Sequence, residues 1–234
     1  MTVQRQAVCA TTAGVAPGAV PRRARVPKAV VRPGRGAPLM DLRGMEGEAA
    51  VRELDFPAGG LVIVSGLPGS GKSTLMQRVV PALDGAGVPV HRIDSQDVRE
   101  RWEAGRFGRL PYGLVRPLVR AAHYHGLRQA LRSGGSVVVH DCGTLAWVRR
   151  WIARTARREG RELHLVLLDV PPAVALSGQR ARGRGVSGYA FGRHRRAVRR
   201  LLARARTARL PKGFTASVLL DRRAADALER TTFG

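Results

Sequence analysis

LVIVSGLPGSGKST, from Leu61 to Thr74, is the stretch that decides the fold. Its first four residues, Leu61 to Val64, form an apolar run that predicts a strand buried on both faces. Residues 66–73, GLPGSGKS, fit the pattern G-x-x-x-x-G-K-[ST] at every fixed position, and a helix-compatible run, TLMQRVV, follows. Strand, glycine loop and helix thus come in the order that a phosphate-binding loop requires. The alternative is an ordinary glycine-rich turn between a strand and a helix.

The residue types of this segment suit a loop that wraps around phosphate. Glycine lets consecutive backbone N–H groups turn toward one anion, and the N-terminus of the next helix adds partial positive charge. Lys72 would reach the β and γ phosphates, and the Ser73 hydroxyl would ligate Mg²⁺. We therefore expect ATP and Mg²⁺ as cofactors, with the nucleotide bound by Gly66, Leu67, Pro68, Gly69, Ser70, Gly71, Lys72, Ser73 and Thr74.

The composition is strongly basic. With 41 Lys and Arg against 17 Asp and Glu, the chain of 234 residues has a formal charge of +24. A charge of this sign attracts nucleic acid, nucleotides and anionic membrane surfaces. Arg, Ala, Gly and Val are all abundant, however, as the coding bias of a GC-rich genome produces. The excess charge therefore indicates either a nucleic-acid partner or no dedicated partner at all.

The remaining composition excludes several classes of protein. Cys9 and Cys142 are the only cysteines, which excludes a disulfide framework and a metal site built on paired cysteines. No apolar run reaches membrane-spanning length, and the N-terminus lacks an apolar signal core. We expect a cytoplasmic protein with no membrane insertion. The length suits one α/β domain with some extra segments.

The first 38 residues differ from the rest of the chain. They contain five prolines, seven basic residues and no acid, and they show no periodic apolar face. We predict a disordered basic extension over 1–38 and a nucleotide-binding domain over 39–234. The extension is either an arm that touches nucleic acid or a non-native segment upstream of a start at Met40 or Met45.

Strand and helix signals alternate after residue 60. Glycine-containing or proline-containing breaks separate apolar runs from helical segments such as 111–132, which contains Pro117. Strands that alternate with helices imply a parallel sheet covered on both faces, so we expect a three-layer α/β/α fold with ligands at the carboxyl ends of the strands. The five expected strands are Leu61–Val64, Val88–Asp94, Ser136–Asp141, Glu162–Val170 and Ser217–Asp221.

Carboxylates follow several of these strands. Asp97 lies just past the second strand, where it could accept the proton of a hydroxyl group or help to hold Mg²⁺, and Arg99 could hold the acceptor or the γ-phosphate. The alternative for Asp94 or Asp97 is capping of a helix N-terminus. Asp141, at the end of the third strand, is our candidate for the magnesium site. Asp169 ends the better apolar run, VLLD, but Asp-Val-Pro-Pro is typical of a turn, so Asp169 ranks lower.

Arginines stand among glycines between Ala175 and Arg200. This pattern suits a lid that closes over transferring phosphates, where Arg180, Arg182 and Arg184 could neutralise charge. Most arginines of the segment must nevertheless belong to a solvated basic helix, because a site can use only one or two.

Two aromatic segments have competing interpretations. His123-Tyr124-His125 resembles a metal-binding spacing, but residues i and i+2 of a helix point apart, and no acid or cysteine is adjacent. Trp147 and Trp151 lie one helical turn apart and could stack on bases. The alternative for this pair is packing of its helix against the sheet.

These motifs together resemble those of the small P-loop kinases, a group that includes polynucleotide 5′-kinase, zeta toxins, adenylylsulfate kinase and AAA-family ATP-binding proteins. The resemblance covers about residues 61–221 and rests on GLPGSGKST, an Asp-x-Arg after the second strand, VVVHD, VLLDVP and the Arg-rich lid. It implies a P-loop NTPase fold in which Lys72 and Ser73 handle phosphate and Mg²⁺. By the same resemblance Asp97 is the acceptor-side base and Arg182 a lid arginine, and Arg150 matches an arginine on the helix after the third strand.

The chain departs from the pattern of this group in three places. Gln96 stands where an acid is often found, and Cys142-Gly143-Thr144 replaces Ala-Thr-Asn. Gly178 aligns with the first lid arginine of many relatives. These departures concern the acceptor and the catalytic rate rather than nucleotide binding.

The expected function is transfer of the γ-phosphate of ATP to a hydroxyl acceptor, either a nucleic-acid 5′ end or a small metabolite. One alternative is a regulatory or nucleic-acid-associated ATPase without a dedicated acceptor, and another is a protein that binds ATP only structurally. The absence of an N-K-x-D stretch, which specifies guanine, does not decide between ATP and GTP. The sequence does not indicate an oligomeric state.

Overall fold

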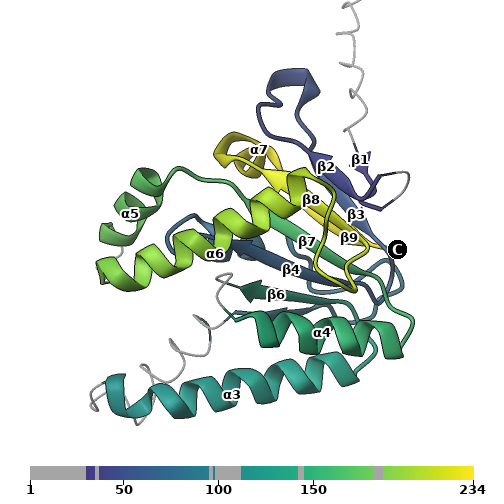
Figure 1. Cartoon of the computed structure of the whole chain (residues 1–234). Coiled ribbons are helices and arrows are strands. Elements are labelled where there is room, and N and C mark those ends of the chain that lie inside the picture. The colour runs from purple at the N-terminus through teal and green to yellow at the C-terminus, as the bar shows by residue number, and fades with distance from the viewer. Residues whose placement is uncertain (1–29, 35–36, 95–96, 98–111, 142–144, 182–186) are drawn as a thin grey trace, which may run out of the picture.

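A parallel sheet of six strands forms the centre of the molecule (Figure 1). The computed structural model describes residues 30–34, 37–94, 97, 112–141, 145–181 and 187–234. All neighbouring strands of this sheet run parallel. The five strands expected from the sequence are confirmed, and the additional strand β2 lies at one edge. In spatial order the strands are β2 (Leu39–Asp41), β8 (Ala216–Leu220), β7 (Leu163–Leu168), β4 (Leu61–Gly66), β6 (Val137–Asp141) and β5 (His91–Ile93).

Helices cover both faces of the sheet, which confirms the three-layer α/β/α fold. Strand β4 shows the reason, because Leu61 and Ile63 pack into the core on one face and Val62 and Val64 into the core on the other. Helices α3, α4 and α6 cover the first face, and α1 and α7 cover the second. The helices are α1 (Lys72–Val79), α3 (Tyr112–Arg132), α4 (Ala146–Arg158), α5 (Pro172–Arg180), α6 (Gly188–Arg206) and α7 (Arg222–Ala227).

A second, three-stranded parallel sheet packs on the face that carries α1 and α7, and the sequence did not indicate it. Its strands are β1 (Val30–Val31), β3 (Glu53–Phe56) and β9 (Arg230–Phe233). Acids are depleted in strands, yet β3 contains two. Glu53 accepts a hydrogen bond from Arg230 Nε at 2.6 Å, and Asp55 accepts one from Thr232 Oγ1 at 2.9 Å. Partners that are distant in the sequence therefore stabilise this strand.

Part of the N-terminal extension belongs to these sheets. Val30 and Val31 pair with Glu53 and Leu54, and the carbonyl oxygen of Pro38 accepts a hydrogen bond from Ser217 N at 2.8 Å. The prediction of disorder is therefore wrong for residues 30–34 and 37–38, because backbone pairing with the domain orders a segment that has no apolar periodicity of its own. Residues 1–29 lie outside the described part of the chain.

The helix signals of the sequence agree with the structure in two places. α1 ends at Val79, close to the stop expected before Pro81, and α3 continues through Pro117 over the predicted helical segment. Within the described ranges, no helix combines the length and the apolar character that crossing a membrane requires.

His164 makes the fold sensitive to acid. Its ring is fully buried in β7, 5.2 Å from the ring of Phe56, and burial lowers its pKa to about 4. Glu162 Oε2 lies 3.2 Å from His164 Nε2 but is half exposed, so solvent screens this carboxylate and burial dominates. As the pH falls from about 6.5 to about 4, His164 binds a proton in the unfolded chain but stays neutral in the folded chain. The free energy of unfolding should therefore fall by about 3 kcal/mol from this group.

Urea unfolding of the wild type and of His164→Leu, at several pH values between about 7 and about 4, checks this prediction. The stability of the variant should depend less on pH, and the two curves should converge or cross toward acid. The exposed His125→Leu controls for the loss of a histidine elsewhere. Equal pH dependence in the wild type and in His164→Leu would contradict the assignment.

Candidate nucleotide-binding site

The glycine loop starts at the centre of the main sheet. β4 lies between β6 and β7, and all of its residues are buried. Its last residue, Gly66, lies so close to β7 that an added Cβ would be 2.9 Å from the carbonyl oxygen of Leu168. The loop ends at Gly71, whose φ of 94° is left-handed, and α1 begins at Lys72. The N-terminus of α1, with the partial positive charge of its helix dipole, therefore faces the loop.

Lys72 is held at the loop by backbone contacts. Its side chain is only 3% exposed, and Nζ donates hydrogen bonds to the carbonyl oxygens of Gly66 at 3.0 Å and Leu67 at 2.7 Å. A buried ammonium requires such partners, because desolvation disfavours its charge. The ammonium lies beside the loop that the sequence assigns to phosphate.

Two serine hydroxyl groups, of Ser70 and Ser73, suit the binding of a triphosphate and a metal ion at the glycine loop. Ser70 Oγ is buried and has no hydrogen-bond partner among the described residues. An orphaned buried hydroxyl costs about 1–3 kcal/mol, and an anion in the loop would satisfy it. Ser73 is buried in the first turn of α1, at the position where a hydroxyl can ligate Mg²⁺. The residues present therefore fit a magnesium triphosphate.

Asp141 lies next to the loop on the neighbouring strand. It ends β6 and is in register with Ser65, the residue before Gly66. Its side chain is 8% exposed, and Oδ2 accepts hydrogen bonds from Arg149 Nη1 at 2.7 Å and from Ser65 Oγ at 3.4 Å. Arg149 therefore orients the carboxylate that we expect near the metal ion. Arg150, which the resemblance matches to an arginine of this helix, is exposed, and it is its neighbour Arg149 that contacts Asp141.

Asp97 and Asp94 have different surroundings. Asp97 is 27% exposed, and its Oδ2 lies 3.7 Å from Arg92 Nε. Asp94 is buried, and its Oδ1 lies 2.8 Å from His140 Nδ1 on β6. Asp97 is thus the more accessible carboxylate and stays our candidate for the acceptor-side base. The sequence analysis did not identify the pair of Asp94 and His140. The histidine inside the apolar strand VVVHD could have indicated it.

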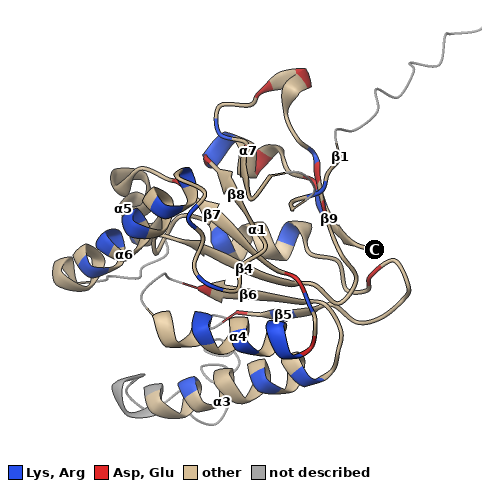
Figure 2. Cartoon of the chain, turned by 45° about the vertical axis from the view of Figure 1, so that its right-hand side comes forward, with Lys and Arg blue, Asp and Glu red and all other residues tan. Residues whose placement is uncertain are grey.

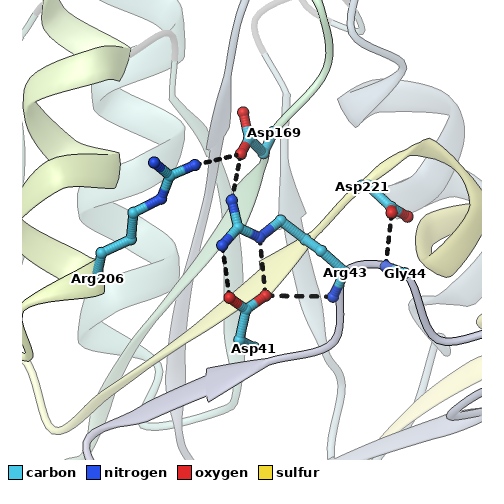
Figure 3. A network of polar contacts seen from close by, with 6 residues as sticks. All are labelled: Asp41, Arg43, Gly44, Asp169, Arg206 and Asp221. Atoms are coloured by element: carbon cyan, nitrogen blue, oxygen red, sulfur yellow. Dashed lines mark hydrogen bonds and ion pairs between the residues drawn. The ribbon is translucent and has the colours of Figure 1, made fainter.

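Asp169 belongs to a network of ion pairs (Figure 3). Its Oδ2 accepts hydrogen bonds from Arg43 Nη1 at 2.6 Å and from Arg206 Nη2 at 3.2 Å. Arg43 Nε also donates to Asp41 at 2.8 Å, and this hydrogen bonding lowers the pKa of Asp41. The network joins β2 to the end of β7 and to the last turn of α6. These contacts give Asp169 a structural role at this end of the sheet.

Helix α5 packs directly on the glycine loop. A Cβ added to Gly69, whose φ is 85°, would lie 2.1 Å from the carbonyl oxygen of Ala175 and 2.7 Å from Gln179 Cγ. A Cβ added to Gly178 would lie 2.7 Å from the carbonyl oxygen of Gly69. Glycine on both sides therefore permits this contact. Gly178, which departs from the arginine of many relatives, is the residue that lets α5 approach the loop.

A cavity of about 310 Å³ opens between the loop, α5 and α7. Gly71 and Thr74 line it on the loop side, Gly178 on α5, and Arg222 and Asp226 on α7. Arg222 Nε pairs with Asp226 at 3.0 Å, and Nη1 lies 3.5 Å from a Cβ added to Gly71. Sequence reasoning missed Arg222. Its position in the sequence could have indicated it, because Arg222 follows the carboxyl end of β8, at the edge of the sheet where the loop begins.

Several predicted residues lie outside the described part of the chain: Arg99, Arg182, Arg184, Gln96 and Gly143. Of the proposed lid segment, the structure describes α5, which ends at the exposed Arg180, and α6, which begins at Gly188. The assignment of a lid stays a prediction.

The two aromatic segments singled out in the sequence lie on α3 and α4. Among the described residues, no group of three or more His, Cys, Asp or Glu side chains could hold a metal ion. Partial burial of His123 lowers its pKa, and its ring lies 5.3 Å from that of Tyr124. Trp151 packs partly buried against the core, whereas Trp147 is 46% exposed. The two tryptophans therefore have different roles.

Comparison with known proteins gives one family match. A family model described as an AAA domain matches residues 61–208, more than half of the chain. No curated protein matches the sequence.

Matches to solved structures are distant. A chain of the PezAT chromosomal toxin-antitoxin system of Streptococcus pneumoniae is 16% identical with a TM-score of 0.41, and the match covers 53% of this chain and 52% of that one. This chain thus spans about half of its length. Shikimate kinase from Bacteroides thetaiotaomicron is 14% identical, with a TM-score of 0.36 and coverage of 72% and 92%. The tunicamycin resistance protein of Deinococcus radiodurans is 16% identical, with a TM-score of 0.31 and coverage of 68% and 84%.

Proposed function

The chain belongs to this AAA-domain family, and we propose that it transfers the γ-phosphate of ATP to a hydroxyl acceptor. One observation carries the proposal: the loop that holds Lys72 lies at the same sheet edge as two carboxylates, Asp141 in register with β4 and Asp97 past the end of β5. Binding of a nucleotide requires only the loop. Transfer to an acceptor also requires a group that takes the acceptor's proton, and a carboxylate beside the loop suits that role.

The triphosphate would lie along residues 66–74, with the nucleoside in the cavity of about 310 Å³ beside Arg222. Mg²⁺ would be held by Ser73, with Asp141 behind it, and would neutralise charge on the phosphates. Lys72 Nζ would turn from the carbonyl oxygens of Gly66 and Leu67 to the transferring group.

The proposed reaction is a direct transfer of the phosphoryl group between two oxygen atoms. The acceptor hydroxyl oxygen forms a bond to the γ-phosphorus, and the bond from that phosphorus to the bridging oxygen breaks, so ADP leaves. Asp97 accepts the hydroxyl proton. Arg99 and Arg182 are proposed to hold the acceptor and the γ-phosphate. The acceptor is either a nucleic-acid 5′ end or a small metabolite.

Replacement of Asp97 by asparagine tests this function. The amide keeps the shape of the side chain but cannot take the proton, so transfer should fall by at least about 100-fold while ATP affinity is kept. The measurement is turnover of γ-labelled ATP with Mg²⁺, with and without 5′-hydroxyl oligonucleotides and a panel of metabolites.

Label that moves to one acceptor in the wild type, and not in Asp97→Asn, would support the proposal and name the acceptor. The exposed Glu48→Gln removes one acid that lies outside the loop and should behave like the wild type. Label released only as free phosphate, at the same rate in Asp97→Asn, would instead identify an ATPase and leave Asp97 as a helix cap.

A further inference from the structure

A second concave feature lies between α3 and α4, on the sheet face away from α1 and α7. Its volume is about 620 Å³, and the transfer reaction proposed above does not use it. Its lining combines aromatic and cationic side chains, namely Tyr124, Trp147 and Trp151 with Arg128, Arg132 and Arg158. We call this feature the α3–α4 groove.

One aromatic ring of the groove is exposed, and the other two are partly buried against the core. Trp147 is 46% exposed, so its ring is open to a ligand from solvent. Its ring lies 5.0 Å from that of Tyr124 at an interplanar angle of 58°, so the two rings are in tilted contact. Trp151 follows one turn later on α4. An exposed tryptophan beside a tyrosine can stack on the face of a base.

The charge of the three helices that cover this sheet face has one sign. α3, α4 and α6 contain four, five and seven arginines and not one aspartate or glutamate. Figure 2 shows these helices carrying blue segments and no red ones. Within the described part of the chain, Arg128, Arg132 and Arg158 form no ion pair. The one acid in the groove lining, Glu159, is paired with Arg161 at 3.0 Å.

We propose that the α3–α4 groove binds single-stranded nucleic acid, with phosphates at Arg128, Arg132 and Arg158 and bases stacked on Trp147 and Tyr124. Cations alone would suit any polyanion. An exposed tryptophan in a concave groove favours a strand with free base faces over a duplex, whose bases are already stacked, and over a flat anionic bilayer. The proposal does not depend on phosphate transfer, because binding can be measured without ATP.

Fluorescence anisotropy with a labelled oligothymidylate of about 12 nucleotides tests the groove. Trp147→Ala should weaken binding by at least about five-fold, and Trp147→Phe, which keeps an aromatic face, should restore most of it. The double variant Arg128→Gln/Arg132→Gln should reduce the slope of log K against log salt, measured between about 50 and about 200 mM, by roughly 0.7 for each phosphate that the protein no longer neutralises. Because both arginines are exposed, the double variant should fold. It therefore still tests the groove if Trp147→Ala does not fold.

The matched control is Arg52→Gln/Arg223→Gln, which removes the same charge from exposed positions outside these helices. It should bind the oligonucleotide nearly as well as the wild type. The proposal is overturned if this control weakens binding as much as the groove variants do, or if neither groove variant weakens it. Binding to phosphatidylserine vesicles without binding to the oligonucleotide would overturn it in favour of a membrane partner.

Discussion

Lys72→Met is expected to lower the rate of ATP turnover by at least about 100-fold and to weaken ATP binding. The ammonium group is buried and held by two loop carbonyl oxygens, so its charge acts at short range in surroundings where little water screens it. Methionine keeps most of the buried stem but removes the charge and the donors. The measurements are turnover of labelled ATP and titration calorimetry with a non-hydrolysable ATP analogue and Mg²⁺.

The control for this substitution is Lys212→Met, which removes the same charge from an exposed position outside the loop. It should leave both quantities unchanged. Far-ultraviolet circular dichroism confirms that each variant is folded. If Lys72→Met kept full affinity for the nucleotide, the assignment of residues 66–74 to the triphosphate would be wrong, and the transfer proposal would fail with it.

The main sheet could be predicted because its central strands are covered on both faces. Such strands need nearly continuous apolar runs, and Leu61–Val64 and the run that ends at Asp169 have them. The small sheet could not be predicted, because β3 contains Glu53 and Asp55, whose partners Arg230 and Thr232 lie 177 residues further along the chain. The amino-acid composition of the β3 segment alone does not indicate these distant partners.

The same distinction applies to the candidate site. The glycine loop is contiguous in the sequence, so its spacing carries the geometry, and Asp141 follows from being the last residue of a strand beside it. Arg149, Arg222 and the pair of Asp94 and His140 depend on which helix and strand faces meet in three dimensions. Arg150 shows how fine this dependence is, since a shift of one residue on a helix turns the side chain by about 100°.

Gly178 is the position where the structure changes the interpretation most. Against the family pattern it appears as a missing arginine, but in the fold it is where α5 meets the carbonyl oxygen of Gly69. An arginine there would require α5 to move off the loop. The contact with α5 therefore explains why a residue without a side chain stands at this place.

Gly178→Ala is accordingly expected to destabilise the protein, although alanine normally stabilises a helix by about 1 kcal/mol relative to glycine. The new Cβ would lie 2.7 Å from the Gly69 oxygen, and overpacking of this kind costs about 1–3 kcal/mol. Because Gly178 also lines the cavity beside the loop, ATP binding should weaken as α5 is displaced. Urea unfolding and nucleotide titration measure the two effects.

Gly192→Ala in α6 is the matched substitution, because nothing lies within 4 Å of a Cβ at that position. Alanine there has its higher helix propensity, and its Cβ does not contact another atom as the Cβ at position 178 would. Gly192→Ala should therefore raise the free energy of unfolding by up to about 1 kcal/mol and leave ATP affinity unchanged. Opposite signs for the two substitutions would isolate the contact between α5 and the loop. If both were stabilising, α5 would not be packed against the loop in solution, and Gly178 would be an ordinary helical position.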